Sequence, residues 1–270
     1  MSSRVIVVTS GKGGVGKTTT TANIGMALAN LGEKVILIDA DIGLRNLDIV
    51  LGLENRIVYD IVDVVEGRCK LKQAVIKDKR QPNLAILPAA QTRDKSAINP
   101  DQMREICKEL EEDFTIIIID CPAGIEQGFK NAIAAATESI IVTNPEVSSI
   151  RDADRVIGLL GASGHEMLPP QLIVNRIRPE MVKQNEMLNV GDVEEILGIK
   201  LLGVVPDDET IITSTNKGMP AVNLENSVAG QALRNIARRI RGEDVPFLDL
   251  TPENNQGIFK IFKKLFAGRK

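Results

Sequence analysis

The sequence SGKGGVGKTTTT at residues 10–21 is rich in glycine and threonine and contains two lysines. Its residues 11–18 fill every required position of the phosphate-binding pattern G-x-x-x-x-G-K-[ST]. The apolar run RVIVVTS, residues 4–10, comes directly before the loop and predicts a buried strand, and residues 17–31 predict a helix. A strand, a glycine-rich loop and a helix in this order predict a nucleotide site, in which backbone N–H groups and a helix N-terminus face phosphate oxygens.

Apolar, β-branched runs recur along the chain and predict six further strands, at residues 34–39, 84–89, 115–120, 139–144, 171–175 and 201–206. Helix-like segments alternate with them, at residues 58–66, 101–112, 126–136, 148–162, 180–198 and 226–241. This alternation is typical of a doubly wound α/β fold, a mostly parallel sheet flanked by helices on both faces. We therefore predict a P-loop NTPase domain over residues 1–241, a flexible tether over 242–256 and a C-terminal amphipathic helix over 257–270.

The phosphate loop and two strand ends supply the predicted ATP and Mg²⁺ site. Lys17 is expected to reach the β- and γ-phosphates, and the Thr18 hydroxyl to bind Mg²⁺. Asp39 and Asp120 end buried strands, where α/β sheets bind ligands, and Asp120 is the predicted metal carboxylate. The predicted nucleotide-binding residues of the loop are Gly11, Lys12, Gly13, Gly14, Val15, Gly16, Lys17, Thr18 and Thr19.

Composition narrows the remaining classes of function. The chain has 270 residues and a net charge of −3, and the five cations of residues 254–270 leave −8 on the rest. A negatively charged body disfavours general binding to nucleic acid. Three widely spaced cysteines and a single histidine, His165, argue against a disulfide framework, a histidine metal site and a Ser–His–Asp triad. With no secretory signal and no apolar run long enough to span a bilayer, a cytoplasmic protein is expected.

The additional lysine inside the loop, Lys12, makes KGGVGKT similar to the deviant Walker A (ParA/MinD) family of P-loop ATPases. This resemblance implies that Lys12 reaches across a homodimer interface onto the partner's nucleotide. It also implies that Asp39 is a second metal carboxylate near Mg²⁺ and that Asp41 orients the attacking water. Lys12, Lys17 and Asp41 are therefore the expected catalytic residues. The residues expected to frame adenine are Asn175, Arg176, Pro206, Asp207 and Asp208.

The stretches DIGLRNLD (41–48) and NPEVSSIRDADR (144–155) resemble the division-site branch of this family. The resemblance implies a slow, Mg²⁺-dependent ATPase that is stimulated by dimerisation and by a partner. It further implies an ATP-dependent homodimer that cycles from the cytoplasm to the inner face of the membrane. The expected partners are a MinC-like division inhibitor and a MinE-like or other topological activator. The expected partner surface comprises Ser148, Arg151, Asp152 and Asp154.

The last stretch, GIFKIFKKLFAGRK (257–270), explains how such a protein would hold a membrane. On a helical wheel its apolar side chains fall within about 160° of arc, with lysines opposite, as in helices that lie in the membrane interface. One copy is expected to bind marginally, whereas two copies in a dimer raise avidity by about 10²–10⁴. The predicted membrane residues are Ile258, Phe259, Ile261, Phe262, Lys263, Lys264, Leu265 and Phe266.

Three alternatives to this function stay open. A flagellar-number ATPase of the same branch would share the loop and often the amphipathic tail. A ParA-type partition ATPase would bind DNA in its ATP state, which the negative body disfavours. A metabolic P-loop ligase would have no use for a basic and apolar tail.

Overall fold

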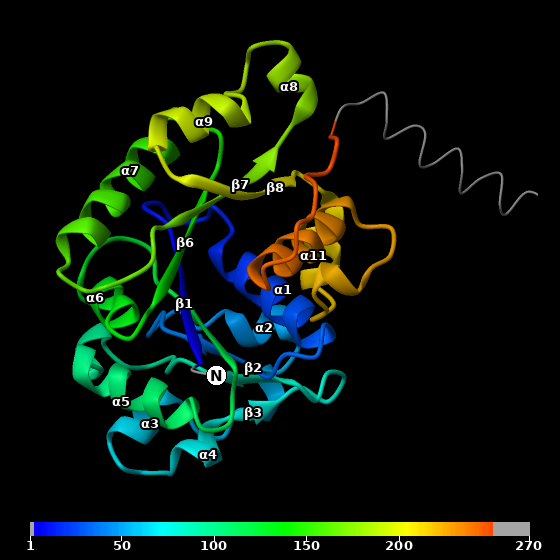
Figure 1. The fold of residues 1–270 in the computed structure, drawn as a ribbon. Helices are drawn as coiled ribbons and strands as arrows, with labels where there is room; N and C mark the ends of the chain where they lie inside the picture. Colours follow the sequence, from blue (N-terminus) through cyan, green and yellow to red (C-terminus); the bar gives the residue numbers. More distant parts are fainter. Residues whose placement is uncertain (1–2, 251–270) are drawn as a thin grey trace, which may run out of the picture.

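The computed structural model describes residues 3–250, which form a single mixed sheet with helices on both faces (Figure 1). The strands are β1 (Arg4–Thr9), β2 (Val35–Asp39), β3 (Ile76–Lys77), β4 (Leu84–Leu87), β5 (Ile116–Asp120), β6 (Glu138–Thr143), β7 (Gln171–Ile177) and β8 (Lys200–Pro206). Their order is β3-β4-β2-β5-β1-β6-β7-β8, and every neighbouring pair is parallel except the antiparallel pair β3 and β4. The predicted doubly wound fold is confirmed.

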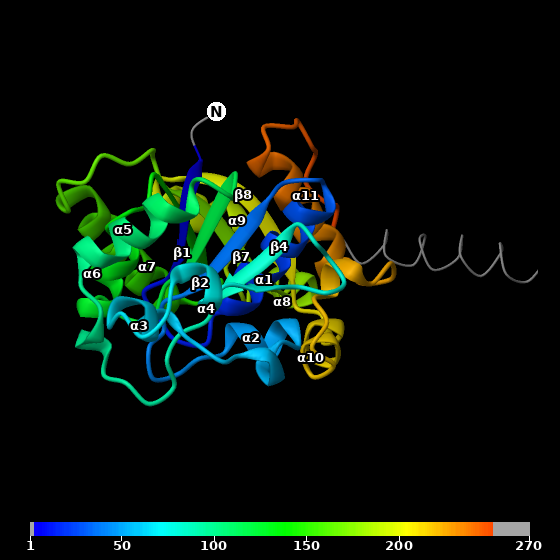
Figure 2. The ribbon, with the colours of Figure 1, turned by 90° about the horizontal axis from the view of Figure 1, so that it is seen from below.

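Two helical layers cover the sheet (Figure 2). One face packs against α3 (Ile61–Val65), α4 (Leu71–Ala74), α5 (Pro100–Leu110), α6 (Gln127–Ile133), α7 (Val147–Ala162) and α9 (Val190–Leu197). The other face packs against α1 (Lys17–Asn30), α2 (Leu47–Leu51) and α11 (Val228–Ile240). The short helices α8 (Pro179–Lys183) and α10 (Glu209–Thr215) follow β7 and β8 at the carboxyl end of the sheet.

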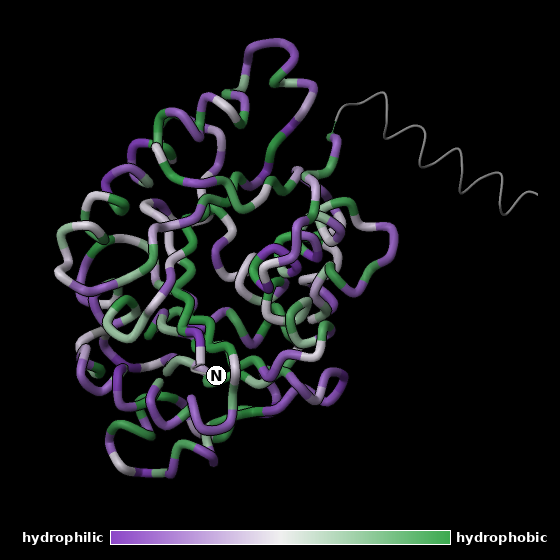
Figure 3. The backbone as a smooth tube through the Cα atoms, viewed as in Figure 1, coloured by the Kyte–Doolittle hydropathy of each residue, from purple (hydrophilic) through white to green (hydrophobic). Residues whose placement is uncertain are grey.

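The central strands are apolar without interruption because both of their faces are covered. In β5, Ile117 and Ile119 belong to the core under α5 and α6, whereas Ile116 and Ile118 belong to the core under α1. All five residues of the strand are buried, including its terminal Asp120. Such strands are typical of parallel sheets, and Figure 3 shows their continuous hydrophobic colour through the centre of the molecule.

Two predicted helices are wrong in extent. Residues 180–198 form two helices, α8 and α9, because Asn185 takes a left-handed conformation (φ 56°) and Asn189 caps α9 by accepting the Asp192 N–H at 2.9 Å. Such an asparagine cap starts a new helix rather than continuing an old one. The segment predicted over 58–66 is helical only in Ile61–Val65, where Asp60 is the N-cap. The short elements β3, α2, α4 and α10 were not predicted.

The first part of the predicted tether packs on the body. We call residues 243–250 the strap. Val245 is 8% exposed, and Arg239 of α11 donates to the carbonyl oxygens of Val245 and Pro246, both at 2.8 Å. Leu248 packs against the core under α11, whereas Leu250 packs against the core of the opposite face, so the strap passes the β8 edge of the sheet. The remainder of the tether and the predicted amphipathic helix lie outside the described residues.

Candidate functional site

The phosphate loop lies between β1 and α1 and follows a path that its glycines permit. Gly14 (φ 78°) and Gly16 (φ 98°) are left-handed, a conformation that costs other residues about 1–2 kcal/mol. Gly11 touches α7 so closely that a β-carbon there would lie 2.1 Å from the Asp152 carbonyl oxygen. The loop is therefore fitted against α7 on one side and leads into the N-terminus of α1 on the other.

The two loop lysines point to different places. Lys17 is 7% exposed, and its Nζ donates to Ser10 Oγ at 3.0 Å, while Ser10 Oγ donates to the Lys12 carbonyl oxygen at 2.7 Å. Lys12 is outside the loop's interior: its side chain is 43% exposed, and its Nζ lies 3.2 Å from Ser148 Oγ and 3.5 Å from Glu146 Oε2. Lys17 is thus a buried cation of the site, and Lys12 is a surface cation at the start of α7.

Two buried carboxylates lie side by side at the ends of β2 and β5, where Asp39 and Asp120 are register partners. Burial raises the pKa of Asp39 to about 6, although its carboxylate accepts N–H groups from Asp41, Asn46 and Leu47 at 3.0–3.2 Å. Burial, and then repulsion by Asp39, raise the pKa of Asp120 to about 8. A cation bound between these two buried carboxyl groups would stabilise their ionised forms.

The residues present fit Mg²⁺. The ion prefers oxygen ligands and commonly uses one or two carboxylates together with substrate phosphates. Thr21 Oγ1 donates to the Asp120 carboxylate at 3.4 Å. The Thr18 side chain lies close enough to Asp120 to lower the pKa of that carboxyl, so the hydroxyl predicted as a ligand is beside the acid pair. Asp41 is half-buried, and its backbone N–H is bound by Asp39. The structure therefore brings Thr18, Asp39, Asp41 and Asp120 together at one end of the sheet.

The residues predicted to frame adenine lie at the neighbouring strand ends but do different things. Asn175 donates from Nδ2 to the Val15 carbonyl oxygen at 2.7 Å and so contacts the phosphate loop. Arg176 is exposed and left-handed (φ 58°), at a register irregularity of β7. Asp208 caps α10 by accepting the Thr210 N–H at 2.9 Å, and Asp207 pairs with Arg178 at 2.6 Å.

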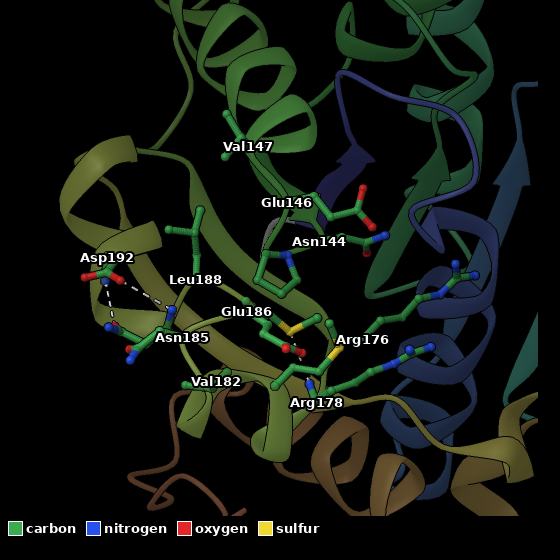
Figure 4. Close-up of a pocket in the computed structure, with 14 residues that line it drawn as sticks. Asn144, Glu146, Val147, Arg176, Arg178, Val182, Asn185, Glu186, Leu188 and Asp192 are labelled. Carbon is green, nitrogen blue, oxygen red and sulfur yellow. Dashed lines mark hydrogen bonds between the residues drawn. The ribbon is translucent and has the colours of Figure 1, made fainter.

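The predicted partner surface lies on the first turns of α7, beside the phosphate loop. Ser148, Arg151 and Asp154 are exposed, whereas Asp152 is half-buried because its backbone lies against Gly11. A cavity of about 670 Å³ opens next to this turn, between the end of β7 and helices α8 and α9. Figure 4 shows Glu146, Asn144, Arg176 and Arg178 on one side of it and Val182 and Leu188 on the other.

Several contacts of the site join residues that the sequence does not single out. Ser10 holds Lys17, Glu146 approaches Lys12, and Thr21 binds Asp120. Ser10 and Thr21 are in the quoted stretch, so their position beside the loop was the available signal. Glu146 carries no such local signal, because it meets Lys12 only in the folded chain.

Comparison with known proteins identifies the family. Residues 6–221 match the CobQ/CobB/MinD/ParA nucleotide binding domain. The septum site-determining protein MinD of Synechocystis sp. is 58% identical over 266 residues, which are 98% of this chain and 99% of the relative. The chain belongs to the MinD family. The resemblance inferred from the sequence is thereby confirmed.

Solved structures of MinD proteins have the same fold. A chain of the MinC:MinD cell division protein complex of Aquifex aeolicus is 51% identical and superposes with a TM-score of 0.85, covering 92% of this chain and 99% of that chain. MinD of Pyrococcus horikoshii, solved with Mg-ADP, is 33% identical with a TM-score of 0.79, covering 88% and 96%. Among residues 3–250, no helix is long and apolar enough to cross a bilayer.

Proposed function

We propose that this chain is a Mg²⁺-dependent ATPase that cycles between a cytoplasmic monomer and an ATP-bound homodimer on the inner face of the membrane. The dimer would recruit a MinC-like inhibitor and so take part in selecting the division site. The proposal is supported by the family and by the names of its members, which include septum site-determining proteins and a MinC:MinD complex. A MinE-like or other activator would set the rate of release.

Nucleotide binding is supported by the phosphate loop and the acid pair. The loop N–H groups and Lys17 would hold the phosphates, with Thr18, Asp39 and Asp120 around Mg²⁺. When bound, Mg²⁺ neutralises phosphate charge that develops during phosphoryl transfer. The backbone N–H of Asp41 donates to Asp39 at 3.0 Å, and Asp41 is the residue proposed to orient water.

The position of Lys12 is the observation that carries the proposal. Phosphoryl transfer is accelerated by a cation placed on the phosphate oxygens, and supplying it from a second subunit makes hydrolysis depend on dimerisation. Lys12 is not enclosed in its own loop but is part of the surface beside α7, with its ammonium close to Glu146 and Ser148. A long side chain at the surface next to the phosphate loop suits a role in trans.

The membrane step rests on the sequence of residues 257–270. A single short amphipathic segment binds marginally, and a dimer carries two, so the second insertion is effectively intramolecular. ATP would therefore promote membrane binding through dimerisation alone, and hydrolysis would reverse it.

Sedimentation with anionic-lipid vesicles tests the proposal on the full chain with Mg·ATP, Mg·ADP or no nucleotide. We expect pelleting only with ATP, loss of pelleting in Lys12→Ala, and persistent pelleting in Asp41→Ala because hydrolysis is slowed. Lys72→Ala is the control: it removes an exposed lysine, 72% accessible, that pairs with Asp113 away from the site. Equal pelleting in all nucleotide states, or none in any state, contradicts the membrane switch; salt-sensitive DNA binding with ATP would support the partition alternative.

A further inference from the structure

The strap ends at the loop that follows β8. Leu250 lines a cavity of about 440 Å³ together with Pro179, Pro206 and Val228, and Asp207 and Asp208 also line it. Pro206, Asp207 and Asp208 are three of the five residues expected to frame the adenine base; the other two, Asn175 and Arg176, do not line this cavity. We propose that Leu250 forms a wall of the base site, so that base binding and docking of the strap stabilise each other. This inference rests on the proposed function, because it assumes that the chain binds adenine nucleotides.

The strap is held firmly enough to place Leu250. The Arg239 guanidinium donates to three carbonyl oxygens, those of Leu202 in β8 at 3.0 Å and of Val245 and Pro246 in the strap at 2.8 Å. The same group lies over the Phe247 ring at 4.3 Å from its centre. Arg239 thus joins α11, the last strand and the strap. Hydrogen bonds from a charged donor are stronger than neutral ones, so this joint is a firm anchor.

The chemistry of the cavity suits a base better than a phosphate. Its walls at Pro179, Pro206, Val228 and Leu250 are apolar. The remainder is lined by Thr210 and by four acidic residues, Glu180, Asp207, Asp208 and Glu209, whose negative charge disfavours a polyanion. A heteroaromatic ring can pack on the apolar walls of the cavity. Its amino hydrogens can donate to acceptors near the carboxylates. The volume falls within the roughly 300–1,000 Å³ typical of ligand pockets, so Leu250 lines the space rather than filling it.

Linkage makes the contact reciprocal. If a docked strap raises affinity for the base, the bound base must favour the docked strap by the same factor. The strap comes shortly before residues 257–270 in the chain. A nucleotide-bound molecule would therefore present that segment from a fixed point at the β8 edge.

The experiment compares two leucines of the strap in the full chain. Leu250→Ser removes the cavity wall, while Leu248→Ser removes a similar half-buried leucine that packs on the opposite core. Affinities for Mg·ADP and for Mg·tripolyphosphate, which has no base, are measured by calorimetry. We expect Leu250→Ser to weaken ADP binding about 3- to 10-fold, as for loss of a partly exposed apolar contact, and to leave tripolyphosphate binding unchanged. Leu248→Ser should change neither.

A second variant keeps the cavity wall and frees the other end of the strap. Arg239→Gln should weaken ADP binding selectively in the same way, with the melting temperature recorded for each variant. Unchanged or tighter ADP binding in Leu250→Ser, or equal losses for ADP and tripolyphosphate, overturns the inference. Failure of the unsubstituted chain to bind either ligand would overturn the proposed function itself, which distinguishes the two failures.

Discussion

Asn175 connects β7 to the phosphate loop through a single buried hydrogen bond to the Val15 carbonyl oxygen. Gly16, which follows Val15 in the phosphate loop, has no room for a side chain. A β-carbon there would lie 2.4 Å from Asn175 Nδ2. The amide and the glycine together set the height of the loop above the sheet. A residue expected to frame the base thus also shapes the phosphate site.

We predict that Asn175→Ala weakens nucleotide binding about tenfold or more. The substitution leaves the buried Val15 carbonyl oxygen without its hydrogen-bond donor, which costs about 1–3 kcal/mol, and it allows the loop to move. Asn131→Ala is the matched control. Asn131 lies in α6, and its side-chain amide also donates a buried hydrogen bond, to the Ile98 carbonyl oxygen at 2.7 Å. Titration with Mg·ADP and urea unfolding should show lost stability in both variants but lost affinity only in Asn175→Ala. Equal affinities would contradict the role given to Asn175.

The acid pair predicts how stability depends on pH without Mg²⁺ and nucleotide. Burial raises the pKa of Asp39 to about 6, and burial together with repulsion by Asp39 raises that of Asp120 to about 8, both from 3.8. The folded state therefore holds protons that the unfolded state releases, and stability falls as pH rises from about 4 through 8. Asp120→Asn should flatten this fall, measured as unfolding free energy between pH 5 and 9. An unchanged slope would show that the pair does not titrate together.

At the scale of elements, contiguous patterns were predictable and contacts between distant segments were not. The strands could be predicted because their apolar runs are buried on both faces, and the phosphate loop because its residues are consecutive. Helix α2 gave no local signal: the N–H groups of Asn46 and Leu47 are bound by Asp39, at the end of β2. The contact of Leu250 with the loop after β8 likewise exists only in the folded chain.

The packing of the phosphate loop on α7 can be tested with two glycines. Gly11→Ala would drive a methyl group into the backbone of Asp152, so the loop and α7 must separate. We expect nucleotide affinity to fall more than tenfold. Gly158→Ala, on the same helix with nothing within 4 Å, should leave affinity unchanged and raise stability by about 0.5–1 kcal/mol. Similar affinities for the two variants would refute the close packing.

A second glycine contact joins the ends of α2 and α10. A β-carbon at Gly218 would lie 2.5 Å from the Gly52 Cα, and Arg80 donates to the carbonyl oxygens of Gly218, at 2.8 Å, and Leu51. Gly198 is also left-handed, at φ 62°, but has open space around it. Gly218→Ala should therefore cost about 1–3 kcal/mol more stability than Gly198→Ala, since overpacking adds to the backbone strain. Urea unfolding of both variants measures the difference, and equal losses would exclude a tight contact.

At the scale of the whole molecule, the charge distribution predicts the response to salt. Residues 254–270 carry five cations, whereas the rest of the chain carries −8. Attraction between lysines and an anionic surface is screened within about 8 Å at physiological ionic strength. The proposed ATP-dependent binding to anionic vesicles should thus weaken several-fold between 50 and 500 mM salt. Flotation or sedimentation of the vesicles measures the bound fraction. The nucleotide affinity of the same protein is the control, and vesicle binding that resists salt would contradict a contribution from the lysines.

The two edge strands of the sheet affect whether neighbouring copies of the chain can pair through their backbones. One border is β3, an antiparallel strand of only two residues, and the other is β8, where Arg239 already occupies the Leu202 carbonyl oxygen and the strap passes by. Short or covered outer strands resist pairing with another chain. Copies gathered at high density on one surface would then lack a template for joining backbone to backbone. If the proposed membrane binding gathers many copies, these should stay separate molecules or dimers rather than grow into fibres.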